Sequence, residues 1–420
     1  MIGAVATEGA RAGSATTLQR MARGAVLAAF DRVRSGSVTV SEGGELRTFG
    51  GGEPHGLIDM RSPAAWTHLL RGSRGLAEAY ASGHWDSPDL ADLIRVAARN
   101  AGAMDTFRRR LRPLLAPIRL LQGTSRANSR RASRKQIAAH YDLGNDMFEL
   151  MLDRTMSYSC TWFAREDMTL EQAAVAKLDL VCDQLDLQPS DDLLEIGTGW
   201  GGLAIHAAAT RGCRVTTTTI SREQRDYALA RVREAGLADR VTVLLDDYRD
   251  LCGRYDKLVS IEMIEAVGWR NFGVFFRRCS ELLTDAGAML LQAITIDDRA
   301  YEIEKTTRSF IRTYIFPNGC LPSLEVIRGC VAYETDMRPV WLHDLTASYV
   351  RTLREWRANF DAHTDQLASL GYDERFRRLW RLYLAYCEAG FAERRIGDYQ
   401  LLLAKPGYGA RRQVHSPAVG

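Results

Sequence analysis

The chain has 420 residues, more than one domain of average size contains, so we expect two or three domains. Its net charge of +3 is close to neutral and gives no general reason to expect a nucleic acid partner. It contains no apolar run of about 18 residues, which argues against a transmembrane helix. The eight cysteines lack C-x-x-C pairs and metal-ligand spacing, a pattern typical of reduced, buried thiols in a cytosolic protein.

Residues 1–30 are rich in small residues and arginine, and we predict a flexible N-terminal segment. A helical pattern begins within it, at Ala22, and continues to Arg34. The segment has no compact apolar block followed by a cleavage pattern, so it does not resemble a signal peptide.

Residues 31–105 predict a small α+β domain. Two short β-branched or aromatic runs, 37–40 and 45–50, flank Gly43-Gly44, which is the pattern of a hairpin with a tight turn. A helix is expected after Pro88. None of these residues forms a recognisable catalytic pattern.

Residues 106–135 form a basic linker. From Arg108 to Lys135 there are ten basic residues and no acidic one, with leucines between them. Such a stretch fits the surface of an anionic membrane. A solvated linker and an RNA-binding strip are the alternatives, but no aromatic residues stand between the arginines, which disfavours stacking on bases. We therefore expect no nucleic acid partner.

Residues 136–405 show strands alternating with helices, which predicts a parallel, doubly wound sheet. The expected strands are apolar or β-branched runs at 193–196, 215–221, 241–248, 255–262 and 288–294.

After residue 294 the chain is predicted to be largely helical. Aromatic residues recur at helical spacing in 349–360 and 373–391, which favours a packed core; a wall for an apolar substrate is the alternative. A late strand is expected at 399–404, and residues 406–420 are expected to be a flexible tail.

The stretch 193–202 reads Leu-Leu-Glu-Ile-Gly-Thr-Gly-Trp-Gly-Gly and precedes a helical run at 203–209. Strand, glycine turn and helix in this order are typical of a nucleotide-binding crossover. The spacing G-x-G-x-G-G, with Glu195 two residues before Gly197, is the usual start of an S-adenosylmethionine (SAM) methyltransferase. An ordinary glycine turn in an α/β domain is the alternative.

Polar residues gather where each of the expected strands ends. Because ligands of a parallel sheet bind outside the carboxyl ends of its strands, this arrangement favours a nucleotide site. The polar clusters are Glu195–Gly199, Thr219–Ser221, Asp246–Tyr248, Glu262–Glu265 and Gln292–Thr295.

Five longer motifs carry a family resemblance. The chain resembles cyclopropane-fatty-acyl-phospholipid synthases and the related mycolic acid cyclopropane synthases over residues 70–403. The motifs are His-Tyr-Asp-Leu-Gly-Asn-Asp at 140–146, Met-Ser-Tyr-Ser-Cys at 156–160, the glycine turn at 195–202, Asp-Tyr-Arg-Asp at 247–250 and Tyr-Ile-Phe-Pro-Asn-Gly at 314–319.

The resemblance implies a Rossmann-like methyltransferase sheet with helical lipid-binding insertions in residues 136–405. It also implies transfer of a methyl group from SAM to the cis double bond of an unsaturated acyl chain in a membrane phospholipid. Proton loss from the carbocation to a bound bicarbonate ion then closes a cyclopropane ring. Such an enzyme would be cytoplasmic and peripheral on the inner face of the membrane; whether it forms a homodimer is left open.

Site residues are carried over by position. The resemblance implies that bicarbonate is held by Cys160 (through its backbone), Glu265, Gln292, Ile294 and Tyr349. It implies that SAM is contacted by Tyr141, Tyr158, Ser159, Gly197, Gly199, Thr219, Gln224 and Asp246 or Asp247. Local alternatives are a packing role for the Cys160 thiol, a helix cap for Glu265 and a core position for Tyr349.

Two positions depart from the family pattern. Ala266 and Gln292 stand where the synthases commonly have histidine. Glutamine donates a hydrogen bond but carries no positive charge, so it either preserves the anion site or weakens it. A weakened base would give a methylene-branched chain, which a partner reductase would convert to a methyl branch. A catalytically silent membrane protein that binds lipid or SAM, and a small-molecule methyltransferase, are further alternatives.

Overall fold

The computed structural model describes residues 16–307, except 101–143, and residues 309–410, except 318. The chain forms two compact units. The first comprises the residues up to Asn100 together with Asp373–Leu382, and the second comprises the remainder. Helix α15 (Glu374–Ala392) therefore contributes residues to both units.

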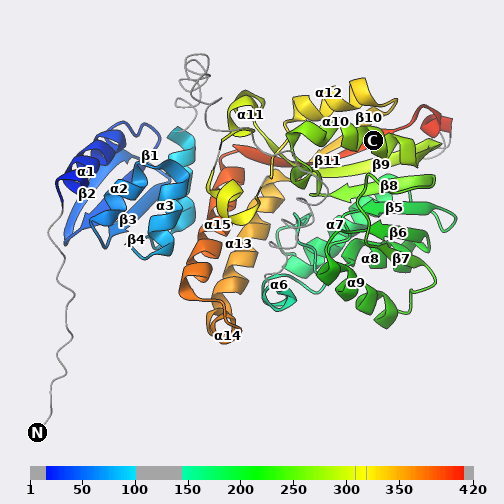
Figure 1. Ribbon diagram of the computed structural model, residues 1–420, viewed down its shortest axis with the longest axis horizontal. Coiled ribbons are helices and arrows are strands. Elements are labelled where there is room, and N and C mark those ends of the chain that lie inside the picture. The colour runs from blue at the N-terminus through cyan, green and yellow to red at the C-terminus, as the bar shows by residue number, and fades with distance from the viewer. Residues whose placement is uncertain (1–15, 101–143, 308, 318, 411–420) are drawn as a thin grey trace, which may run out of the picture. The chain divides into compact units, whose positions relative to one another are not determined.

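The first unit is built on a four-stranded sheet in the order β2-β1-β3-β4 (Figure 1). The predicted hairpin is confirmed, because β1 and β2 pair antiparallel with Gly43 and Gly44 between them. Strand β3 lies parallel to β1 on its other side. The elements are α1 (Thr17–Phe30), β1 (Gly36–Glu42), β2 (Glu45–Gly51), β3 (His55–Met60), α2 (Ala64–Leu69), α3 (Gly72–Ala81), β4 (Trp85–Asp86) and a helical stretch at 90–100.

Helix α1 occupies residues for which a flexible segment was expected. It starts five residues before the predicted helix, at Thr17, because Thr16 and Gln19 form a reciprocal capping box. Its residues Val26 and Leu27 are buried. The cap and this apolar face correct the prediction of flexibility for residues 17–30.

Arg378 explains why the first part of α15 belongs to the first unit. Its guanidinium is nearly buried and donates to the carbonyl oxygens of Tyr80 (2.7 Å) and Trp85 (3.0 Å). It also pairs with Asp86 at 3.1 Å. A buried arginine is tolerated when its donors are satisfied in this way.

The second unit contains a seven-stranded sheet in the order β10-β11-β9-β8-β5-β6-β7. Strands β9, β8, β5, β6 and β7 run parallel, so the predicted doubly wound α/β sheet is confirmed. The strands are β5 (Asp192–Ile196), β6 (Arg214–Thr218), β7 (Val241–Leu244), β8 (Tyr255–Ile261), β9 (Leu283–Ile296), β10 (Arg338–Asp344) and β11 (Ile396–Ala404). The helices before α15 are α6 (Asn145–Met151), α7 (Leu170–Leu185), α8 (Gly202–Arg211), α9 (Arg222–Glu234), α10 (Phe272–Leu282), α11 (Asp298–Glu304), α12 (Leu324–Glu334), α13 (Thr346–Ala362) and α14 (Thr364–Ser369).

In the part of the chain that is described, no helix has the length and hydropathy needed to cross a membrane.

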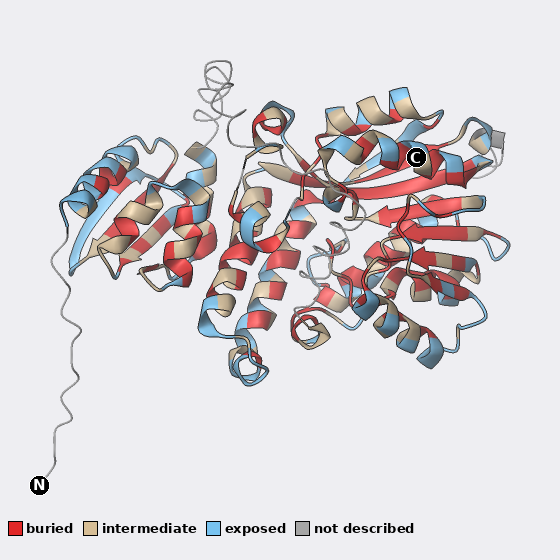
Figure 2. Ribbon diagram, viewed as in Figure 1, coloured by how far each residue is buried: buried red, intermediate tan, exposed pale blue. Residues whose placement is uncertain are grey.

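Each face of this sheet carries its own hydrophobic core. Met289 and Leu291 of β9 pack in one cluster with α10 and α12, while Ala288 and Leu290 pack in the other with α7, α8 and α9. The alternation follows from the two-residue period of a strand. Figure 2 shows the central strands largely buried and the outer helix faces exposed.

Strand β10 was not predicted. It lies at the edge of the sheet, antiparallel to β11, and most of its residues are exposed. It also contains Pro339, which cannot donate to a ladder and is confined to edge strands. Its sequence has neither the apolar alternation nor the β-branched run from which the other strands were predicted.

Candidate active site

The glycine turn lies between β5 and α8. Gly197 (φ +107°), Gly199 (φ +52°) and Gly201 (φ +84°) all have left-handed backbones, which only glycine adopts without strain. A Cβ at Gly199 would meet no atom within 4 Å, so the backbone at this residue borders open space. The turn therefore leaves main chain accessible to a ligand at the carboxyl edge of the sheet.

The segment 156–160 is held beside this turn. A Cβ at Gly202 would lie 2.4 Å from the carbonyl oxygen of Thr155, so only glycine allows the close approach. Arg231 of α9 donates to the carbonyl oxygens of both Thr155 (3.1 Å) and Trp200 (2.9 Å). These contacts bring two predicted cofactor residues, Tyr158 and Ser159, toward the glycine turn.

Both residues are fixed by buried partners. The hydroxyls of Tyr158 and Tyr383 are hydrogen-bonded at 2.7 Å, and Ser159 accepts from the buried Lys177 ammonium at 3.1 Å. Burial lowers the pKa of Lys177. Tyr141, the remaining aromatic residue assigned to SAM, lies outside the described residues.

The other predicted cofactor residues follow β6 and β7. Thr219 donates to the side chain of Gln224 at 2.8 Å, and both are buried where α9 begins. Asp247 is buried and accepts two hydrogen bonds from the Arg249 side chain, at 2.7 and 2.6 Å. Asp246 is exposed. Asp247 therefore has a structural partner, whereas the Asp246 carboxylate faces solvent.

Three acidic residues, Glu262, Glu265 and Asp398, form what we call the acid cluster, at the carboxyl end of β8 beside β9 and β11. Asp398 is fully buried, and the two glutamates keep some exposed surface although their carboxyl groups are withdrawn from water. Met263 stands between the glutamates, and a Cβ at Gly197 would lie 3.3 Å from its side chain. The cluster thus adjoins the glycine turn. Among the described residues, no group of His, Cys, Asp and Glu side chains is arranged to hold a metal ion.

Glu262 is the most heavily hydrogen-bonded carboxylate of the cluster. Its Oε1 accepts from the backbone N–H of Cys160 and from Nε2 of Gln292, each at 2.8 Å. Its Oε2 accepts from the hydroxyl of Tyr349 at 2.6 Å. Three groups from distant parts of the chain therefore converge on one side chain.

The Cys160 thiol is not the part of that residue that meets the cluster. Its Sγ donates to the carbonyl oxygen of Thr161 at 3.1 Å, and burial raises its pKa well above the usual value. The thiol therefore stays protonated and is a poor nucleophile, because the thiolate is the reactive form.

Glu265 has one donor and one unpaired oxygen. Its Oε1 accepts from the backbone N–H of Ile294 at 2.6 Å, whereas its buried Oε2 has no hydrogen-bond partner. Burial, and then the charge of Glu262, raise the pKa of Glu265 to about 8. The carboxyl group bonds a strand residue and not the end of a helix, which disfavours the alternative of a helix cap.

Gln292 links the cluster to β11. Its Nε2 donates to Asp398 at 2.9 Å as well as to Glu262, and its Oε1 accepts from Gln400 at 2.9 Å. Gln292 and Gln400 are directly opposite in the ladder. Burial, and then the charge of Glu262, raise the pKa of Asp398 well above its ordinary value.

Sequence reasoning missed four members of this network: Glu262, Asp398, Gln400 and Lys177. Polar residues two apart in an otherwise apolar strand were the available signal for Asp398 and Gln400. Glu262 fell in a polar cluster at a strand end, but only its neighbour Glu265 was given a role. No local pattern marked Lys177 on α7.

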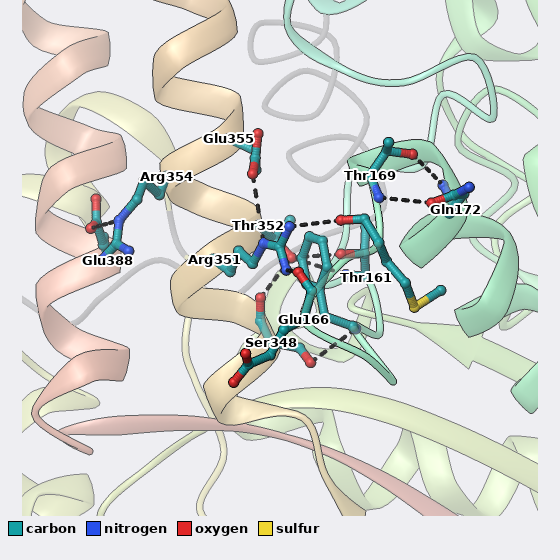
Figure 3. Close-up of polar contacts among 12 residues, drawn as sticks. Thr161, Glu166, Thr169, Gln172, Ser348, Arg351, Thr352, Arg354, Glu355 and Glu388 are labelled. Carbon is teal, nitrogen blue, oxygen red and sulfur yellow. Dashed lines mark hydrogen bonds and ion pairs between the residues drawn. The ribbon is translucent and has the colours of Figure 1, made fainter.

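Helix α13 holds the chain that carries Cys160. Arg351 donates to the carbonyl oxygens of Glu166 (2.8 Å) and Met168 (2.7 Å), and the hydroxyl of Thr352 is bonded to that of Thr161 at 2.8 Å. Figure 3 shows these side chains extending from α13 to the segment after Cys160. Because Tyr349 is on the same helix, these contacts position two of the donors to Glu262.

The five groups assigned to bicarbonate come together, but they are engaged with protein atoms. Cys160, Gln292 and Tyr349 donate to Glu262, and the Ile294 N–H donates to Glu265. In this arrangement the residues do not fit a bicarbonate ion, because the donors implied for it are already satisfied.

Comparison with known proteins identifies the group to which this arrangement belongs. Residues 128–401 match the family model described as mycolic acid cyclopropane synthetase. The chain is 39% identical over 373 residues to the tuberculostearic acid methyltransferase UfaA1 of Mycobacterium tuberculosis, covering 85% of this chain and 86% of that protein. It is 35% identical over 351 residues to the cyclopropane-fatty-acyl-phospholipid synthase of Escherichia coli, covering 83% of this chain and 87% of that protein.

Among solved structures, the chain is similar to the mycolic acid cyclopropane synthase CmaA1 complexed with SAH and CTAB. The match has a TM-score of 0.61 and 31% identity, and it covers 65% of this chain and 98% of that one.

Proposed function

Because the chain belongs to the mycolic acid cyclopropane synthetase family and is a SAM-dependent methyltransferase, we propose that it methylates the cis double bond of unsaturated phospholipid acyl chains. Proton loss from the resulting carbocation then closes a cyclopropane ring. The observation that carries this proposal is the acid cluster, whose buried carboxyl groups adjoin the glycine turn.

This chain's own residues suit a cationic intermediate. A carbocation is stabilised by negative charge in a site from which water is excluded. Burial raises the pKa of all three carboxyl groups of the cluster, and Glu262 has the most hydrogen-bond donors to hold its charged form. The rings of Tyr349 and Phe391 are stacked at 4.3 Å beside it, and aromatic faces attract cations. The raised pKa of Cys160 keeps a competing thiolate nucleophile out of the site.

SAM, when bound, supplies the electrophilic methyl group. The residues proposed to hold it are the glycine turn with Gly197 and Gly199, the segment with Tyr158 and Ser159, and the polar residues after β6 and β7. Because the donors implied for bicarbonate are bonded to protein atoms, we propose that the proton lost after methyl transfer passes to a base within the acid cluster.

The proposed substrate is an acyl chain within an intact phospholipid. The name of the E. coli relative supports this, since that protein is a cyclopropane-fatty-acyl-phospholipid synthase. The basic stretch Arg108–Lys135, which lies outside the described residues, is proposed to bind anionic lipid. We accordingly propose a cytoplasmic enzyme that is peripheral on the inner face of the membrane.

A second candidate is the same methyl transfer without ring closure, giving a methylene-branched chain that a partner reductase converts to a methyl branch. Two observations favour it. Gln292 stands where the family resemblance implies a histidine. The relative UfaA1 is described as a tuberculostearic acid methyltransferase.

The test is incubation of the full-length protein with labelled SAM and vesicles of unsaturated phospholipid. We expect label in the acyl fraction and a mass gain of one CH2 group, with fragmentation or NMR separating ring from methylene. An absence of label with an intact fold would favour a silent binding protein. Activity without vesicles that is indifferent to neutralising Arg130, Arg131 and Arg134 would favour a small-molecule methyltransferase.

Membrane binding is tested separately. We expect the protein to bind anionic vesicles at low ionic strength and to lose most of that binding at high ionic strength, because salt screens contacts between basic residues and lipid headgroups. Sedimentation with vesicles measures the bound fraction at low and at high ionic strength. Equal binding at the two salt concentrations would indicate that residues 108–135 are only a linker.

A further inference from the structure

Glu262 has a left-handed backbone at the end of β8. Its φ is +47°, in a region that residues other than glycine rarely adopt. Its N–H donates to the carbonyl oxygen of Gln292 at 2.8 Å, which fixes this turn against β9. Unfavourable backbone conformations of this kind persist mainly where the surrounding structure enforces them, often at functional sites. Here the conformation accompanies a carboxyl group bonded within the acid cluster.

The groups that bind this carboxylate are those that the family resemblance assigned to bicarbonate. The Cys160 N–H, Gln292 Nε2 and the Tyr349 hydroxyl all donate to Glu262, at 2.6 to 2.8 Å. The two remaining groups, the Ile294 N–H and Glu265, are bonded to each other at 2.6 Å. The donors of the implied anion site therefore surround a side chain of the protein itself.

A carboxylate is a close chemical substitute for bicarbonate. Both ions present a planar O–C–O group with one negative charge, and both accept hydrogen bonds on two oxygens. Within the acid cluster, Glu262 receives three hydrogen bonds on its carboxylate, whereas Glu265 and Asp398 receive one each from the donors described above. Burial raises the pKa of Glu262, and its three hydrogen bonds and the nearby Lys177 charge act against that rise. Glu262 is therefore the carboxyl group of the cluster with the most hydrogen-bond donors to hold its charged form.

We infer that the Glu262 carboxylate takes the place of bicarbonate and is the base that accepts the proton from the methylated acyl cation. This inference rests on the proposed function. The π electrons of the acyl double bond form a bond to the methyl carbon while the S–CH3 bond of SAM breaks. A C–H bond of that methyl group then breaks, and its electron pair closes the ring or forms the methylene double bond. The proton passes to an oxygen of Glu262 and leaves to solvent after turnover.

The same inference accounts for Gln292. An anion captured from solution is favoured by a donor that can carry positive charge, whereas a resident carboxylate needs only to be held in place. The neutral amide of Gln292 does so, because its Nε2 donates to Glu262 and Asp398 and its Oε1 accepts from Gln400. Glu262 supplies the negative charge, and Gln292 holds it in place by a hydrogen bond.

The activity test uses the full-length protein, labelled SAM and unsaturated vesicles in CO2-free buffer, with and without added bicarbonate. Wild-type turnover is expected to be the same in both; a bicarbonate requirement would overturn the inference. Glu262→Gly suits the left-handed backbone and vacates the site. We expect this variant to lose about 100-fold in turnover without bicarbonate and to recover much of it when bicarbonate is added.

A binding test needs no turnover. Isotope-labelled bicarbonate followed by NMR is expected to bind Glu262→Gly and not the wild type. If no variant methylates lipid, the proposed function fails, yet this measurement still decides whether Glu262 fills the anion site. Lack of bicarbonate binding or rescue in a folded Glu262→Gly protein would overturn the inference.

Two further variants guard against misfolding. Glu262→Gln keeps the side-chain volume but cannot accept a proton, so it is expected to be inactive and not rescued by bicarbonate. Wild-type turnover of this variant in CO2-free buffer would overturn the inference. Glu325→Gln, at an exposed position on α12, is the matched control and is expected to behave as wild type throughout.

Discussion

The glycine turn and the acid cluster adjoin each other but are built in different ways. The turn consists of consecutive residues, 195–202, and its geometry follows from glycines with positive φ. The acid cluster draws its groups from β8, β9, β11, α13 and the segment after α6. The first is a local structure, whereas the second exists only after the sheet and α13 have packed.

Each region also contains a buried glutamate carboxyl group, and the two groups differ in the number of hydrogen bonds that they accept. Glu195, before the turn, is buried and accepts from the Thr217 hydroxyl at 2.6 Å. Glu262, in the cluster, has three donors and a nearby ammonium. Burial raises the pKa of both glutamates and the Lys177 charge acts against that rise in each, but Glu262 has three hydrogen-bond donors where Glu195 has one. The turn is thus arranged for backbone contact, whereas the cluster directs several donors to one carboxyl group.

Apart from the Glu262 variants, the largest effect is expected from Glu265→Gln, in the cluster. We expect turnover to fall at least tenfold, toward about 100-fold, because the variant removes a carboxyl group whose Oε2 is buried and unpaired beside the reaction site. SAM affinity should be unchanged, since Glu265 bonds Ile294 and not the glycine turn. Steady-state assays with vesicles and calorimetric titration of SAM measure the two quantities. Wild-type turnover would refute a catalytic role for this carboxyl group.

A pH dependence of stability is expected from Glu195, beside the turn. Burial raises its pKa from 4.5 to about 8, so between these values the folded protein binds more protons than the unfolded chain. The free energy of unfolding should therefore fall as pH rises from 4.5 to about 8, by up to about 1.4 kcal/mol per pH unit for this group. Glu265 contributes with the same sign.

Denaturant unfolding at several pH values measures this slope. Glu195→Gln keeps an acceptor for Thr217 but has no proton to lose, so its slope should be shallower than that of the wild type. An identical slope in the two proteins would show that Glu195 is ionised in the folded state.

Gly199→Ala tests whether the open side of the turn is the SAM site. A Cβ there meets no protein atom, so the added methyl group would occupy space that we assign to the cofactor. We expect SAM affinity to fall about tenfold, equivalent to roughly 1.4 kcal/mol. Gly236→Ala is the matched control, because its φ of +68° imposes similar strain and its Cβ is also in open space. Equal SAM affinity in the two variants would place the cofactor elsewhere.

How much could be predicted from the sequence follows the same division. The doubly wound sheet and the glycine turn could be predicted from local sequence patterns. Strand-like segments alternate with helical ones, and glycines occupy the positions where φ is positive. Glu262 was overlooked because nothing local shows that Cys160 and Tyr349, about a hundred residues away on either side, donate to it. The exposed edge strand β10 carried no apolar alternation, and the cap that starts α1 was not recognised.

The smallest effect is expected from Thr352→Val, which loosens the support of the cluster without touching it. The substitution keeps the shape of the side chain but removes the buried hydroxyl that bonds Thr161, so the free energy of unfolding should fall by about 1 kcal/mol. Because Cys160 precedes Thr161, its N–H should then hold Glu262 less firmly, and turnover should fall severalfold with SAM affinity kept.

Thr210→Val on α8 is the matched control. Its hydroxyl makes the same bond to the carbonyl four residues earlier, at 2.7 Å, as the Thr352 hydroxyl does at 2.8 Å, but Thr210 is exposed. If both variants lose the same stability and keep full turnover, the contact between α13 and Thr161 does not position the cluster. If only Thr352→Val loses turnover, the cluster depends on packing from a distant helix in a way that the glycine turn does not.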